Sequence, residues 1–140
     1  MRTCLIDTGP FVAYLDRKDR AHEVVAASIE VFKGQLATTG AVISEVMYFV
    51  SEFPNGPISF AKFLLGSGVR IAEPAQPADI LAAAELMVKY SDTPMDFADA
   101  TLVLLAEELG VTEILILDRR GFSVYKTARG KSFRLVLPLQ

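Results

Sequence analysis

Apolar residues along this chain alternate between short uninterrupted runs and longer stretches with a helical repeat. The short runs predict strands, each of which ends at a turn-forming or polar segment. Residues 114–117, Ile-Leu-Ile-Leu, are typical of an interior parallel strand that is covered on both faces. The predicted strands are Arg2–Ile6, Gln35–Thr38, Val69–Ala72, Glu113–Leu117 and Arg134–Leu137.

Amphipathic segments between these runs predict helices, several of which stop at Gly or Pro. They are Pro10–Leu15, Arg20–Phe32, Ala41–Phe53, Ser59–Leu65, Pro77–Tyr90 and Phe97–Leu109. Strands that alternate with helices predict an α/β protein, a three-layer α/β/α sandwich around a mostly parallel central sheet. The 140 residues contain no evident linker or repeat, so we expect a single domain over residues 1–140.

The amino-acid composition limits the classes of protein to which this chain can belong. The hydrophobic fraction is 51% and the charged fraction 22%, which suits a globular chain. The apolar runs are too short to span a bilayer, the N-terminus does not resemble a signal peptide, and the single Cys4 fits a reducing compartment, so we expect a cytoplasmic protein without a membrane partner. The single His22 excludes catalytic schemes that need two histidines.

Two acidic residues follow predicted strands directly. Asp7 comes after Cys4-Leu5-Ile6, and Asp118 comes after the 114–117 run. Ligands of parallel α/β sheets bind outside the carboxyl ends of the strands, where these two side chains would meet. The alternative is that each aspartate only caps the helix or turn that follows it. Two such residues favour a site over two independent caps.

Two further acidic residues lie within apolar helical segments. Glu45 has Val42 and Phe49 as helical neighbours, and Asp99 is followed by Leu102 and Val103. A carboxylate on a buried face is costly unless it is paired or binds a metal ion. The alternative for Glu45 is a position at the edge of the core with its carboxylate in water.

Asp96 has a simpler interpretation. The segment Thr93-Pro94-Met95-Asp96 is typical of a helix start, with Thr93 as the N-cap, Pro94 at the first position and an acid at the third. We expect that capping explains Asp96 but not Asp99, which lies a turn further in. Residues three apart share a helix face, so both carboxylates can reach the same site.

Crowded carboxylates raise each other's pKa, and a divalent cation removes that conflict. Oxygen ligands favour Mg²⁺ or Mn²⁺ over zinc. Such ions activate water and stabilise charge on a phosphoryl oxygen, without a histidine or serine nucleophile. The candidate ligands are Asp7, Glu45, Asp96, Asp99 and Asp118. A net charge of -3 argues against binding nucleic acid by electrostatics alone, but bound cations would offset it.

Four segments in order along the chain together resemble the PIN-domain nucleases, and among them the VapC-type toxins. They are Leu-Ile-Asp-Thr-Gly-Pro-Phe-Val-Ala at 5–13, Ser-Glu-Val at 44–46, Met-Asp-Phe-Ala-Asp-Ala-Thr-Leu at 95–102, and Leu-Asp-Arg-Arg-Gly-Phe at 117–122. The resemblance implies an α/β/α fold and a Mg²⁺- or Mn²⁺-dependent endoribonuclease acting on RNA such as tRNA or rRNA.

The resemblance also implies roles for particular residues and partners. Asp7, Glu45, Asp99 and Asp118 would form the catalytic acidic set, with Asp96 as an accessory and Thr8 as a supporting hydroxyl. The protein would be a homodimer that a small antitoxin protein silences. Arg119 and Arg120 are candidates for RNA phosphate contacts. Phe122 is expected in the core, and Tyr125 is a candidate for stacking on bases.

Two departures from the family pattern surround Asp118. Ile116 stands where family members often carry Ser or Thr, and Gly121 where they often carry Asp. Both remove polar support, which keeps open a second interpretation, a catalytically weak or inactive RNA- or protein-binding module.

Two other classes share single features with the chain. Asp7-Thr8-Gly9 resembles the signature of aspartic proteases, but the predicted helices argue against an all-β protease. A phosphoacceptor receiver domain would share the strand-end aspartate, but it would leave Glu45 and Asp99 unexplained.

Overall fold

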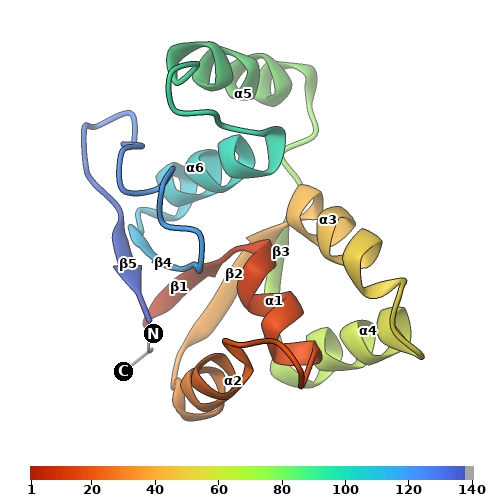
Figure 1. The fold of residues 1–140 in the computed structure, drawn as a ribbon. Coiled ribbons are helices and arrows are strands. Elements are labelled where there is room, and N and C mark those ends of the chain that lie inside the picture. The colour runs from red at the N-terminus through yellow and green to blue at the C-terminus, as the bar shows by residue number, and fades with distance from the viewer. Residues whose placement is uncertain (138–140) are drawn as a thin grey trace.

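A five-stranded parallel sheet forms the centre of the molecule in a computed structural model that describes residues 1–137 (Figure 1). The strands pair in the order β3-β2-β1-β4-β5. In the central strand β1, Cys4, Leu5 and Ile6 are fully buried, which agrees with coverage on both faces. The strands are β1 (Thr3–Ile6), β2 (Gln35–Thr39), β3 (Arg70–Ala72), β4 (Glu113–Leu115) and β5 (Arg134–Val136).

Helices cover both faces of the sheet. Figure 1 shows α5 and α6 on one side and α1, α2 and α4 on the other. The predicted three-layer α/β/α sandwich with a parallel sheet is therefore confirmed. No helix within residues 1–137 is long and apolar enough to cross a membrane. The helices are α1 (Thr8–Leu15), α2 (His22–Val31), α3 (Gly40–Val50), α4 (Gly56–Ser67), α5 (Pro77–Lys89) and α6 (Phe97–Leu109).

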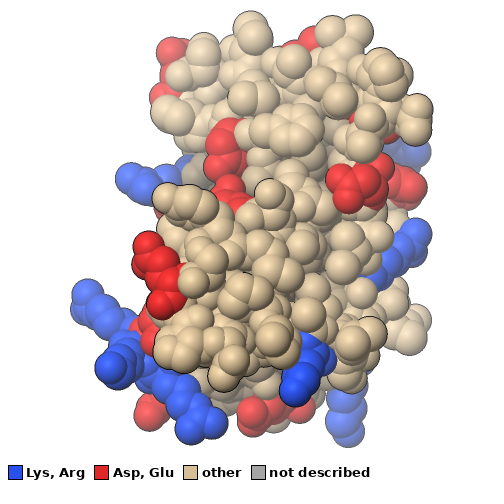
Figure 2. All heavy atoms as spheres, turned by 90° about the vertical axis from the view of Figure 1, so that its right-hand side faces the viewer, with Lys and Arg blue, Asp and Glu red and all other residues tan. Residues whose placement is uncertain are grey.

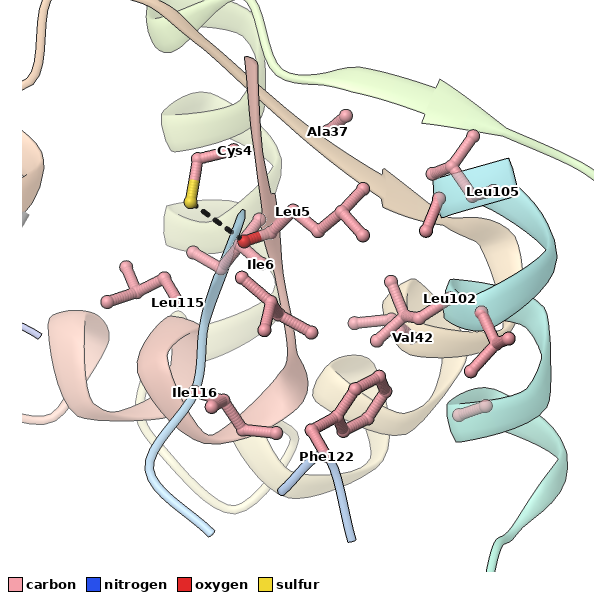
Figure 3. Close-up of a cluster of buried hydrophobic side chains, with 14 of the residues drawn as sticks. Cys4, Leu5, Ile6, Ala37, Val42, Leu102, Leu105, Leu115, Ile116 and Phe122 are labelled. Carbon is pink, nitrogen blue, oxygen red and sulfur yellow. Dashed lines mark hydrogen bonds between the residues drawn. The ribbon is translucent and has the colours of Figure 1, made fainter. Parts of the chain in front are cut away.

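The core lies against both faces of β1. Figure 3 shows the Leu5 side chain pointing from β1 toward α6, which carries Leu102 and Leu105. Each fully buried Leu or Ile side chain contributes about 2 kcal/mol to folding. Cys4 donates a hydrogen bond to the carbonyl oxygen of Leu5 (3.3 Å), and burial raises the pKa of its thiol to about 12. Cys4 is therefore a packed core residue whose thiol stays protonated at neutral pH.

Strand β4 is shorter than its apolar run predicted. The run 114–117 suggested a strand to Leu117, but β4 ends at Leu115. The neighbouring strand β1 ends at Ile6, paired with Leu115, and the Asp7 backbone N–H donates to the Leu115 carbonyl oxygen (3.2 Å). Ile116 is buried without being in a strand, so the apolar run reports burial rather than pairing. Asp118 consequently lies beyond the sheet instead of at its edge.

The amino end of the same sheet carries a compact ion cluster. Glu113, the first residue of β4, accepts hydrogen bonds from the Arg2 guanidinium at 2.7 and 3.0 Å and from Arg134 at 3.0 Å. The Arg2 hydrogen bonds lower the pKa of the Glu113 carboxyl, and the charges of Arg2 and Arg134 add to the effect. The acid at this end of the sheet is therefore paired with basic partners.

Candidate active site

One cavity of about 680 Å³ lies beyond the carboxyl ends of β1 and β4. Acidic residues from separate segments of the chain meet there, as parallel strands would dictate. Arg119 is not among the described residues that line it. The lining includes all the predicted acids, together with Thr8 and Arg120: Asp7, Glu45, Asp96, Asp99 and Asp118. A sixth acid, Asp19 between α1 and α2, also lines the cavity, and the sequence analysis did not single it out.

Asp7 stands between β1 and α1 and is not used as a helix cap. It occupies the N-cap position of α1 with an extended backbone, yet its side chain makes no capping hydrogen bond within residues 1–137. Burial, together with the charges of Glu45, Asp96 and Asp118, raises the pKa of Asp7 to about 6, although a backbone hydrogen bond from Thr8 lowers it. Capping therefore does not account for this residue.

Asp96 and Asp99 form a reciprocal capping box at the start of α6. The Asp99 backbone N–H donates to Asp96 Oδ1 (2.8 Å), and the Asp96 N–H donates to Asp99 Oδ2 (3.2 Å). Two expectations were wrong here. The N-cap is Asp96 rather than Thr93, because the helix begins at Phe97. Capping also involves Asp99, which is the third residue of the helix.

Capping is not the whole electrostatic account of Asp99. Hydrogen bonds to a carboxylate at a helix start favour its charged form. Burial, together with the charges of Asp96 and Asp7, nevertheless raises the pKa of Asp99 to about 8. The negative charge of Asp99 is therefore disfavoured in the folded protein, which capping alone would not produce.

Glu45 lies half-buried on α3, at the rim of the cavity. The buried face of this helix consists of Val42, Val46 and Val50. The expectation that Phe49 shares a buried face with Glu45 was wrong, because Phe49 is 45% exposed. Glu45 thus occupies the edge-of-core position, with its carboxylate directed at the shared cavity instead of the core.

Two buried threonine hydroxyls join the helices that carry Glu45 and Asp99. The Thr101 hydroxyl on α6 donates to the Ala98 carbonyl oxygen (2.7 Å) and therefore accepts from Thr39 Oγ1 at 2.8 Å. Thr39 is the N-cap of α3 and accepts from the Val42 N–H (3.4 Å). The sequence gives no periodic or motif signal for this link, because both threonines look like ordinary apolar-face residues.

Asp118 is held by a neighbouring arginine. Arg120 donates from Nη2 to Asp118 Oδ2 (2.7 Å) and from Nε to Oδ1 (2.9 Å), and its backbone N–H also reaches Oδ1 (3.3 Å). This pairing lowers the pKa of Asp118. Both side chains are mostly exposed, so the ion pair contributes little to stability.

The residues of the cavity suit a hard divalent cation in their chemistry. The acidic residues supply carboxylate oxygens, and the raised pKa values of Asp7 and Asp99 reflect first burial and then neighbouring negative charge, both of which a bound cation would offset. The Thr8 hydroxyl is buried without a hydrogen-bond partner in the described part of the chain. Within residues 1–137, no three His, Cys, Asp or Glu side chains are already arranged to hold a metal ion. The capping box and the Arg120 pair explain this, because they hold Asp96, Asp99 and Asp118.

Comparison with known proteins decides the family. The PIN domain family matches residues 4–128, which span most of the chain and include every acidic residue of the cavity. The chain belongs to the PIN-domain family. A PIN domain is neither an aspartic protease nor a receiver domain, so both of those interpretations are excluded.

Individual PIN-domain relatives match over nearly the whole chain. Ribonuclease VapC26 from Mycobacterium tuberculosis is 30% identical over 134 residues, which cover 94% of this chain and 98% of the relative. The crystal structure of VapC20 from the same organism, described as a toxin that cleaves the sarcin–ricin loop, superposes with a TM-score of 0.80 at 18% identity. That match covers 98% of this chain and all of the other. The resemblance to VapC-type PIN proteins is thereby confirmed.

Proposed function

We propose that this PIN-domain protein is a metal-dependent endoribonuclease that hydrolyses phosphodiester bonds in RNA, as the toxin of a toxin–antitoxin pair. The observation that carries the proposal is the convergence of six acidic residues from distant segments on one cavity, five of which the sequence singled out. A whole-length relative that bears the name ribonuclease supports the same activity. We expect tRNA and rRNA to be suitable substrates for a first assay.

In this proposal Asp7, Glu45, Asp99 and Asp118 hold a Mg²⁺ or Mn²⁺ ion, with Asp96 as an accessory ligand. When bound, the ion supplies Lewis-acid activation of water and neutralises charge on the phosphoryl group. Thr8 supports the site with its unpartnered hydroxyl.

Arg120 exchanges its partner in this scheme. Its exposed ion pair with Asp118 is weak enough to open at little cost. Opening frees the carboxylate for metal binding. It also frees the guanidinium fork to bind an RNA phosphate beside the cavity. Arg119, which is exposed, would contact RNA further from the site.

The partners we propose besides RNA are a second copy of this chain and a small antitoxin protein. The face with α3 and α4 is mostly uncharged (Figure 2). Tyr48, Ile58 and Leu65 on these helices are 73%, 58% and 86% exposed. Burying such side chains between two copies would stabilise a dimer. Light scattering that gives a monomer mass at all concentrations would contradict the dimer.

The activity is tested by incubating purified protein with RNA and Mn²⁺. We expect cleavage that a chelator stops and that Asp99→Asn abolishes. Asp79→Asn is a matched control, because Asp79 is the third residue of α5 in an equivalent capping box away from the cavity. Equal activity in the two variants would mean that Asp99 only caps its helix.

The second interpretation, a binding module without catalysis, is favoured by the Asp118–Arg120 pair, since it already neutralises one candidate ligand. It predicts RNA or protein binding that is indifferent to Mn²⁺. Failure to cleave any RNA in Mn²⁺, with RNA binding retained after Asp99→Asn, would favour this alternative.

A further inference from the structure

Tyr125 lies in the wall of the acidic cavity, although its aromatic ring suggested a surface contact with bases. It is 1% exposed, so the stacking expectation was wrong. Its ring packs edge-on against Tyr90 and Phe122, with ring centroids 4.9 and 5.0 Å away. A large aromatic residue fixed in this way holds its hydroxyl at a defined point beside the carboxylates.

The Tyr125 hydroxyl is committed to the start of α6. It donates a hydrogen bond to the Pro94 carbonyl oxygen (2.8 Å), two residues before the N-cap Asp96. Burial raises the pKa of Tyr125, and the charges of Asp99 and Asp96 raise it further, so the hydroxyl remains a donor. The segment that leads into the capping box is therefore anchored by a side chain from the segment that follows Asp118.

Gly121 makes room for this ring. A Cβ atom at position 121 would lie 2.5 Å from the Tyr125 hydroxyl oxygen and 2.7 Å from two ring carbons. The ring cannot move aside easily, because neighbouring aromatic rings and the Pro94 hydrogen bond hold it. Any larger residue at 121 therefore competes with Tyr125 for the same space.

These observations join into one inference, which rests on the proposed function. We propose that Tyr125 is a positioning residue of the acidic site, which acts through the Pro94 carbonyl to hold Asp96 and Asp99 at the cavity, and that Gly121 is required to admit its ring. Gly121 is then not a lost polar group but one half of a matched pair with Tyr125.

The first experiment removes only the hydroxyl. Tyr125→Phe in the full chain is compared with the wild type for Mn²⁺ affinity by titration calorimetry, and for kcat and KM on RNA. We expect Mn²⁺ affinity and kcat to fall roughly tenfold, on the scale of removing a group that orients a metal ligand, with KM unchanged. A purely structural role would lower the unfolding midpoint without this split.

The control is Tyr90→Phe in the same aromatic cluster. The Tyr90 hydroxyl accepts from the Lys126 N–H (3.0 Å) instead of reaching Pro94, and Tyr90 is outside the cavity lining described for residues 1–137. We expect this variant to keep wild-type Mn²⁺ affinity. An equal loss in both phenylalanine variants would mean that the cluster only packs, and it would overturn the inference.

The second experiment tests the matched pair. Gly121→Ala alone should lower Mn²⁺ affinity and the unfolding midpoint, because its Cβ meets the ring. The same substitution in a Tyr125→Val background should cause no further loss, because the space is then open. Additive losses would show that positions 121 and 125 are independent.

The outcomes separate this inference from the proposed function. If the wild type binds Mn²⁺ and cleaves RNA while Tyr125→Phe is indistinguishable from it, only the positioning role of Tyr125 fails. If the wild type neither binds Mn²⁺ nor cleaves RNA, while Asp7→Asn behaves identically, the proposed function fails and the inference fails with it.

Discussion

The two ends of the sheet treat acidic residues in opposite ways. At the amino end, Glu113 is surrounded by Arg2 and Arg134, and its pKa is lowered. At the carboxyl end, burial and neighbouring acids raise the pKa values of Asp7 and Asp99, and only the more exposed Asp118 among the described acids of the cavity is paired with an arginine, Arg120. The same backbone supports both arrangements, so the fold does not require the crowding. Asp7 and Asp99, which are buried beside other acids, therefore indicate a site that is completed by something the chain does not supply.

The largest expected effect is a difference in RNA cleavage between variants at the carboxyl end and at the amino end of the sheet. Asp7→Asn removes one charge from the crowded end while keeping the shape of the side chain. We expect RNA cleavage to fall by roughly a hundredfold or more, the scale seen when a group that supports transition-state charge is removed. Glu113→Gln makes the same chemical change at the paired end and should leave cleavage unchanged. Parallel RNA cleavage assays check both variants.

Metal binding should stabilise the protein through the carboxyl end alone. With Mn²⁺ at about 100 times its Kd, binding adds about 2.7 kcal/mol to the free energy of unfolding. Thermal unfolding should show this gain in the wild type and in Glu113→Gln. The gain should be lost in Asp7→Asn. An equal gain in Asp7→Asn would place the metal elsewhere.

The pH dependence of the metal-free protein should report the crowding. An aspartate carboxyl in an unfolded chain has a pKa of 3.8, whereas folding raises the pKa of Asp7 to about 6 and that of Asp99 to about 8. Between these values the folded state binds more protons than the unfolded state, so stability falls as pH rises from about 4 to about 8. Thermal unfolding in chelator across this range measures the slope. Asp99→Asn should flatten its upper part.

The buried hydrogen bond between the hydroxyls of Thr39 and Thr101 should contribute measurably to the free energy of unfolding. Thr101→Val leaves the buried Thr39 hydroxyl without its acceptor and removes the side-chain hydrogen bond to the Ala98 carbonyl oxygen. We expect a loss of about 1–3 kcal/mol in the free energy of unfolding. Chemical denaturation measures this loss. Thr3→Val, a threonine-to-valine change at the amino end of β1, should cost less, because Thr3 is only half-buried.

The smallest effect concerns the paired end. Glu113→Gln weakens hydrogen bonds between partly exposed groups, which contribute modestly. We expect the unfolding midpoint to fall by roughly 2–4 °C. The lowered pKa of Glu113 means that its contribution is present at neutral pH and is lost as pH falls. A scanning calorimeter would show a smaller difference between wild type and variant in acid.

Much of the architecture follows from patterns that the sequence displays. The parallel sheet and the meeting of Asp7 with Asp118 follow from where apolar runs end, because the carboxyl ends of parallel strands share one edge. The local hydrogen bonds do not follow from such patterns. Whether Asp96 or Thr93 is the N-cap depends on which of them has the extended backbone that precedes the helix. Both residue types are good N-caps, so the sequence does not distinguish them.

Side-chain packing around the cavity could not be predicted from the sequence either. Gly121 looked like a missing acid when the sequence was compared with the family pattern, because the ring that fills its place comes from four residues further along. The pairing of Arg120 with Asp118 likewise depends on a turn that neither residue encodes alone. The periodicity of apolar residues in a sequence indicates burial and spacing. It does not indicate which polar atoms form hydrogen bonds with each other.

The central claim is that the acids at the carboxyl end of the sheet are completed by a divalent cation. Titration calorimetry of Mn²⁺ into chelator-stripped protein tests it most directly. We predict saturable binding in the wild type and in Glu113→Gln, and its loss in Asp7→Asn and Asp99→Asn. Binding of equal affinity in all four proteins, or no binding in the wild type, would contradict the claim.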